Sequence, residues 1–75
     1  MAHKKYKAIG SIEDKVIEEC SELIKAICKA KRFGLENFHP DHPERKNWED
    51  ILEEIDDVRD RVHEYDQSLR KEFSS

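Results

Sequence analysis

The sequence lacks a long apolar run, an excess of positive charge and the apolar content of an ordinary globular chain, and each shortage excludes a class of protein. No stretch approaches the roughly 20 apolar residues that a membrane-spanning helix needs. The opening MAHKKYK is charged, but the apolar segment of a secretory leader does not follow it. We therefore expect a cytoplasmic protein that has no membrane partner.

Apolar residues are too few for a generous core. They make up 36% of the 75 residues and charged residues make up 43%, against the usual 45–50% and about 25%. A single domain of this size also hides only about 60% of the surface that its unfolded chain exposes. Association with further copies would supply the missing burial.

Positive charge is not in excess. Fourteen Lys and Arg residues face 18 Asp and Glu residues, which gives a formal net charge of -4. Binding to a nucleic acid depends on neutralising phosphates with clustered cations. Nucleic acid is therefore not an expected partner.

Cysteine is also scarce, since only Cys20 and Cys28 are present. In one helix, eight residues span about 12 Å along the axis, whereas a disulfide needs Cα atoms within about 7 Å. We expect two small buried thiols in a reducing compartment.

Apolar residues recur every three or four positions in the first half of the chain, which is the spacing of an amphipathic helix. They are Ile9, Ile12, Val16, Cys20, Leu23, Ile27 and Ala30. Ser11 suits the N-cap, and Gly34 suits the left-handed conformation that closes a helix. The pattern predicts a helix over about 12–33.

Both prolines lie in the next segment, FGLENFHPDHPERKN, and they predict a loop over 34–47. Asn47 resembles an N-cap, with Asp50 at the third helical position. A second apolar stripe follows, with Trp48 expected in the core, and it predicts a helix over about 48–72. The expected fold is a single all-α domain over 1–75, an antiparallel helical hairpin that dimerises into a four-helix bundle.

Each predicted helix carries an acidic stretch with nearly the same sequence pattern, EECSEL at 18–23 and EEIDDV at 53–58. At about 100° per residue, Glu19 and Glu22 flank Cys20 with the same offsets that Glu54 and Asp57 have from Ile55. In an antiparallel hairpin these flanks face each other across the seam. We therefore expect the four carboxylates to converge.

Four anions at the edge of a low-dielectric seam repel one another unless something neutralises them. Carboxylate oxygens suit Mg²⁺, with Mn²⁺ as a substitute. The plain alternative is a solvated acidic face paired with lysines. A zinc site at His39 and His42 is a weaker hypothesis, because the loop offers no second pair of ligands.

EECSE followed about thirty residues later by EEIDD resembles the EExxE and ExxD signature of the MazG-like all-α nucleoside triphosphate pyrophosphohydrolases. The intervening AKRFGLENFHP is similar to the inter-helix loop of small bacterial and phage-type members, and the resemblance covers roughly residues 16–58. It implies a Mg²⁺-dependent enzyme that hydrolyses NTPs or dNTPs to the monophosphate and pyrophosphate.

The resemblance also implies roles for single residues. Glu19, Glu22, Glu54 and Asp57 match the metal-binding acids, and Glu18 is a candidate for orienting or deprotonating the attacking water beside Glu19. Cations and loop side chains provide candidates for binding the nucleotide. These substrate-binding candidates are Lys29, Arg32, Asn37 and His39.

The chain departs from the family after the second motif. VRDRVHEYDQSLRKEFSS is strongly charged, whereas members usually continue with a mainly apolar stretch and a further helix that helps to close the substrate pocket. A homodimer or higher oligomer is then expected to complete the site. The alternative function is a non-catalytic acidic helical module for interaction or dimerisation.

Overall fold

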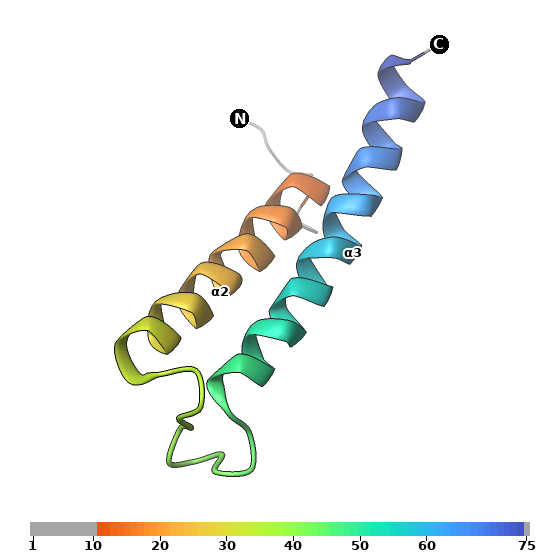
Figure 1. The fold of residues 1–75 in the computed structure, drawn as a ribbon. Coiled ribbons are helices and arrows are strands. Elements are labelled where there is room, and N and C mark those ends of the chain that lie inside the picture. Colours follow the sequence, from red (N-terminus) through yellow and green to blue (C-terminus); the bar gives the residue numbers. More distant parts are fainter. Residues whose placement is uncertain (1–10, 75) are drawn as a thin grey trace.

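The fold is a pair of antiparallel helices joined by one loop (Figure 1). The computed structural model describes residues 11–74. Helix α2 spans Ile12–Phe33 and helix α3 spans Asn47–Phe73, so the predicted all-α hairpin is confirmed. Ile9, the first residue of the predicted apolar stripe, lies outside the described residues. Neither α2 nor α3 has an apolar stretch of the length and hydropathy needed to cross a bilayer.

Helix α2 has the predicted signals at both ends. Ser11 Oγ accepts a hydrogen bond from the backbone N–H of Asp14 (3.1 Å), and the Asp14 carboxylate accepts one from the N–H of Ser11 (3.4 Å). This reciprocal pair is a capping box. At the other end, Gly34 donates its N–H to the carbonyl of Ala30 (2.7 Å) and takes a φ of 103° with a ψ of 144°. This positive φ favours glycine, although it lies outside the left-handed helical region that we expected.

The start of α3 corrects the sequence prediction, because Lys46 and not Asn47 is the N-cap. The backbone N–H of Lys46 donates to Glu49 Oε1 (2.8 Å), so Glu49 has the place in the first turn that we expected for Asp50. Asn47 is the first helical residue and is 3% exposed. Its Nδ2 donates to the carbonyl of Gly34 (2.8 Å). Asn47 thus fastens α3 to the end of α2, through a contact that local capping patterns do not encode.

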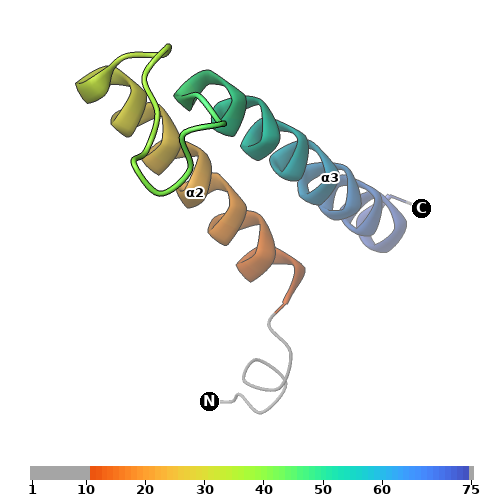
Figure 2. The ribbon, with the colours of Figure 1, turned by 90° about the horizontal axis from the view of Figure 1, so that it is seen from below.

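The loop between the helices (Figure 2) is held by backbone hydrogen bonds between its two ends. The N–H of Asn47 donates to the carbonyl of Asn37 (2.8 Å), and a single antiparallel bridge pairs Phe38 with Lys46. Between these two residues the chain makes two consecutive hydrogen-bonded turns around the prolines. The bridge and turns hold the loop against the end of the hairpin.

The hairpin has little buried core of its own. Among residues 11–74, only Ala30 and Asn47 are buried. The expectation of a core position for Trp48 is wrong, since this residue is 40% exposed. The expectation of buried thiols is also wrong, because Cys28 is exposed and Cys20 is half-buried, and both are free. The physical reason is that two helices cover each other on one side only.

The exposed apolar side chains gather on one face. Ala30 marks the side of α2 that meets α3, and Asn47 marks the corresponding side of α3. At about 100° per residue, the large exposed apolar residues of the two helices lie about 40–140° to the same side of these two markers, apart from Phe33, which lies about 60° to the other side. In an antiparallel pair such rotations point to one face. This apolar face consists of Ile17, Ile24, Ile27, Trp48, Leu52, Val62, Leu69 and Phe73.

Replacing Ser11 by alanine tests the capping box. We expect Ser11→Ala to lower the free energy of unfolding by about 1 kcal/mol, because the N–H of Asp14 loses its acceptor. Ser21→Ala is the matched control, since it removes an exposed hydroxyl that bonds only the carbonyl of Glu18 (2.8 Å) within α2, and alanine is the better helix former. Urea denaturation measures both values, and equal losses would contradict the role of Ser11.

Candidate metal centre

Three carboxylates from the two helices meet on the side of the seam away from the apolar face. Glu19 of α2 and Glu54 and Asp57 of α3 each offer one oxygen, and these oxygens lie within 4.8 Å of one another. Around the axis of α2, Glu19 lies about 20° from Ala30, on the side opposite the apolar face. Around the axis of α3, Glu54 lies about 20° and Asp57 about 80° from Asn47, also on the side opposite the apolar face. Such spacing allows one hard cation to contact all three carboxylates. We call this set the carboxylate triad.

Glu54 has the most perturbed environment of the triad. Its side chain is half-buried, and this burial raises the pKa of Glu54 above its ordinary value. The charges of Asp57, Glu19, Glu22 and Glu53 raise the pKa further. Both effects disfavour the anion, so a proton or a cation bound beside Glu54 is stabilised.

Glu22 lies beside the triad but is not part of it. Its carboxylate is 4.0 Å from the Nζ of Lys25, and its charge reaches Glu54. The predicted convergence of four carboxylates is therefore a convergence of three, with the fourth at its border. Glu18 is exposed, about 100° around α2 from Glu19, and its role as a base stays a prediction.

A network of ion pairs lies between the triad and the loop. Asp50 receives a hydrogen bond from Arg45 Nε (2.8 Å), and its other oxygen is 3.8 Å from the Nζ of Lys29. Arg45 also donates to Glu53 (2.8 Å). The hydrogen bond to Asp50 is the main cause of the raised pKa of Arg45. The network ties the loop to α3 and holds the ammonium group of Lys29 between the triad and the loop.

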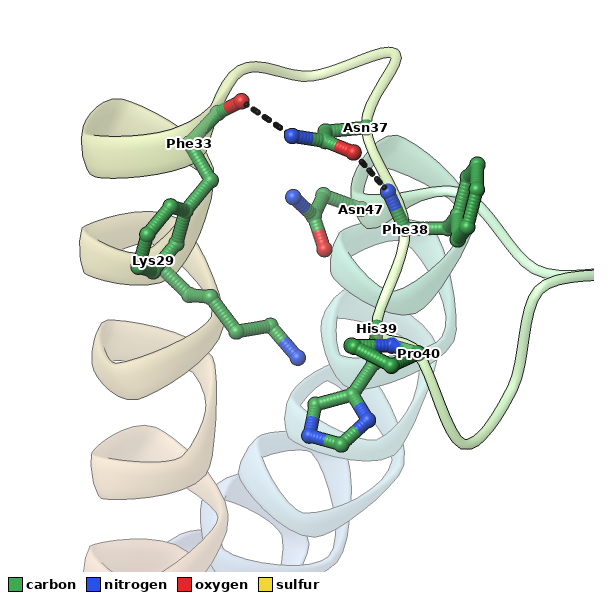
Figure 3. Close-up of a pocket in the computed structure, with 7 residues that line it drawn as sticks. All are labelled: Lys29, Phe33, Asn37, Phe38, His39, Pro40 and Asn47. Atoms are coloured by element: carbon green, nitrogen blue, oxygen red, sulfur yellow. Dashed lines mark hydrogen bonds between the residues drawn. The ribbon is translucent and has the colours of Figure 1, made fainter.

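A pocket of about 560 Å³ opens at the loop end of the hairpin (Figure 3). It is lined by Lys29, Phe33, Asn37, Phe38, His39, Pro40 and Asn47. Three of the four predicted substrate-binding residues are thus brought together, namely Lys29, Asn37 and His39. The fourth, Arg32, does not line this pocket, and its guanidinium carbon lies 5.8 Å from the centre of the Phe33 ring. We call this hollow the loop pocket.

Two of the predicted binding side chains make hydrogen bonds within the protein. Asn37 donates from Nδ2 to the carbonyl of Phe33 (3.0 Å) and accepts from the N–H of Phe38 at Oδ1 (2.8 Å). His39 Nδ1 accepts from the N–H of Asp41 (3.0 Å), which leaves Nε2 as the ring nitrogen for a ligand. Asn37 therefore shapes the wall of the loop pocket.

Sequence reasoning missed three of the residues that line the loop pocket, namely Phe33, Pro40 and Asn47. Phe33 is the last residue of α2, and Asn47 resembled a cap. No motif identified either of them. The available signal for Asn47 was its amide side chain, which can bond across the hairpin as well as within its own helix.

Comparisons of the chain with protein-family models, with curated proteins and with solved structures found no match in any of the three. The likeness to MazG-like pyrophosphohydrolases stays a prediction that rests on the two acidic motifs and on the intervening AKRFGLENFHP.

Replacing Glu54 by glutamine tests the repulsion within the triad. Between the ordinary pKa of glutamate and the raised pKa of Glu54, the folded state binds the proton more tightly than the unfolded state, so the free energy of unfolding falls as pH rises. We therefore expect Glu54→Gln to stabilise the metal-free protein at neutral pH, with a gain that shrinks as pH falls through the raised pKa.

Thermal unfolding in the presence of a chelator, followed by circular dichroism from neutral to mildly acidic pH, measures this gain. Asp60→Asn is the matched control, because Asp60 is an exposed carboxylate on the same helix outside the triad. A gain of the same size in both variants, or a gain independent of pH, would contradict the environment assigned to Glu54.

Proposed function

We propose that the protein is a Mg²⁺-dependent nucleoside triphosphate pyrophosphohydrolase of the MazG-like kind, which cleaves NTPs or dNTPs to the monophosphate and pyrophosphate. The observation that supports this proposal most directly is the approach of Glu19, Glu54 and Asp57 to within 4.8 Å. The donor set fits a hard divalent cation, since it is made of carboxylate oxygens from two helices and includes one whose anion is disfavoured in the absence of a cation.

In this proposal the triad binds Mg²⁺, with Mn²⁺ as a substitute. The bound cation would supply positive charge that offsets the negative charge developing on the leaving pyrophosphate. Lys29 lines a hollow of about 290 Å³ beside Glu22 and Glu54 and also lines the loop pocket. In the proposal its ammonium group binds a phosphate and the loop pocket binds the nucleoside.

The proposed enzyme is a homodimer that forms a four-helix bundle. The apolar face exposes more large side chains than a two-helix chain can cover, with Ile17, Leu52 and Phe73 at 64%, 53% and 77% exposure. Packing two such faces together would bury both stripes. The triad lies on the other side of each hairpin, so this contact leaves the metal centres open to substrate.

The second candidate function is a non-catalytic module that binds a helix or another copy of itself. The apolar face favours it, because contiguous apolar surface is typical of interaction sites. In this case the triad is only a water-exposed acidic patch that keeps the outer side of the hairpin hydrated. Turnover of a nucleotide distinguishes the two candidates, since dimerisation is expected of both.

Pyrophosphate release tests the enzymatic proposal. The purified protein with Mg²⁺ should release pyrophosphate from at least one member of a panel of NTPs and dNTPs, and a chelator should abolish the release. Glu19→Gln and Glu54→Gln should each reduce the rate by about 100-fold or more, because each removes a carboxylate from the cation.

Asp60→Asn should keep the full rate of release. Folded wild-type protein that releases no pyrophosphate from any member of the panel with Mg²⁺ or Mn²⁺ would favour the interaction module.

Charge on the apolar face tests the dimer. Leu52→Glu should raise the dissociation constant of the dimer by about 100-fold or more, because it places an unpaired charge in a desolvated contact. Ser21→Glu is the control, since it adds the same charge to an exposed position on the outer side of α2. Analytical ultracentrifugation over a range of protein concentrations measures both constants. A wild-type chain that stays monomeric, or an unchanged Leu52→Glu dimer, would contradict this arrangement.

A further inference from the structure

Asn47 carries a buried acceptor that the fold does not use. The residue is 3% exposed and lines the loop pocket. Its Nδ2 donates to the carbonyl of Gly34 (2.8 Å), and since a carbonyl oxygen can only accept, the orientation of the amide is fixed. Within residues 11–74, none of the side-chain hydrogen bonds reaches Oδ1. In Figure 3 this oxygen points toward the space between Lys29 and His39.

An unpartnered acceptor in a buried side chain indicates a missing donor. The donors that line the pocket do not reach it, since among residues 11–74 no hydrogen bond joins Lys29 Nζ or His39 to Oδ1, and the Nζ of Lys29 lies 3.8 Å from Asp50 instead. The backbone carbonyls of Gly34 and Phe33 can only accept, and they accept from Asn47 and Asn37. A ligand that enters the loop pocket far enough to reach Oδ1 must therefore present an N–H or O–H group at its inner edge.

The walls of the loop pocket indicate the shape of that ligand. Phe33 of α2 and Pro40 of the loop contribute apolar surface, and the Phe33 side chain is 56% exposed. Phe38 also lines the pocket, but Figure 3 shows its ring on the side of the loop away from Asn47. An aromatic ring beside an open pocket suits the flat face of a heterocycle, which stacks on it whatever its substituents. The ligand is then planar, with a polar hydrogen on its edge.

We infer that the loop pocket binds a nucleobase that carries an amino group, namely adenine, cytosine or guanine, and that Asn47 Oδ1 accepts a hydrogen bond from this amino group. Uracil and thymine have no amino group and present an N–H between two carbonyl oxygens, and Oδ1 would repel those oxygens as it approached the N–H. Asn47 thus determines specificity for the base.

The position of the loop pocket fits the proposed function. The inference of a base site rests on that function only for the claim that the whole substrate is a nucleotide. Asn47 and Glu54 are seven residues apart on α3, about 10 Å along its axis. Lys29 lines both the loop pocket and the hollow beside Glu54. A nucleotide whose base reaches Asn47 would therefore extend its phosphates past Lys29 toward the triad.

Titration with nucleosides tests the base site without phosphate, metal or hydrolysis. Cytidine and uridine are a matched pair, because the amino group of one is replaced by a carbonyl in the other. In nitrogen–proton correlation spectra of the labelled protein, cytidine should shift the side-chain amide signals of Asn47 saturably. Uridine should bind at least about tenfold more weakly, since it has no amino group and two carbonyl oxygens flank its remaining N–H.

Two variants locate the binding. Phe33→Ala should weaken cytidine binding about tenfold, because it removes a stacking surface. Leu35→Ala is the control, since Leu35 has the same exposure as Phe33, 56%, and does not line the loop pocket. Asn47→Leu should abolish the preference for cytidine over uridine where circular dichroism shows that the variant folds, and Phe33→Ala provides the test where it does not.

The outcomes separate this inference from the proposed function. Saturable cytidine binding at Asn47 supports the base site even in a protein that releases no pyrophosphate. Pyrophosphate release without nucleoside binding at the loop pocket would overturn the base site, while the proposed enzymatic function would stand. Equal affinity for cytidine and uridine, or shifts confined to other residues, would also overturn the role of Asn47.

Discussion

Repulsion among Glu19, Glu54 and Asp57 is the main electrostatic constraint at the seam between the two helices. The three carboxylates come within 4.8 Å at the seam of the hairpin, and burial and like charge together raise the pKa of Glu54. A fold with so little core gains nothing in stability from such an arrangement. A cation beside the triad would turn the repulsion into attraction, and it would couple metal binding to the stability of the folded chain.

The apolar face and the candidate site lie on opposite sides of the hairpin. One side carries the apolar face and the other carries the triad, the ion-pair network and the loop pocket. The same helical periodicity produces both sides, because carboxylates and apolar residues have opposite offsets from the line along which α2 and α3 meet. Association through the apolar face would therefore complete the core without covering the candidate site.

Sequence reasoning succeeded where local rules decide the structure. Ser11, Gly34 and the apolar spacing predicted α2, and the repeated acidic spacing predicted that Glu19 and Glu54 would face each other. It failed where contacts across the hairpin decide. Asn47 bonds Gly34 instead of capping α3. Glu22 lies at the border of the triad, where its neighbour within α2 is Lys25. The burial of Trp48 and Cys28 was overestimated because two helices enclose less than their stripes suggest.

Calorimetric titration of MgCl₂ and then MnCl₂ into the purified protein, with and without a non-hydrolysable nucleoside triphosphate, measures cation binding at the triad. We expect saturable binding that tightens when the nucleotide is present and that is lost in Glu54→Gln. Absence of binding heat for both cations, with and without the nucleotide, would contradict this expectation and leave the triad as a solvated acidic flank.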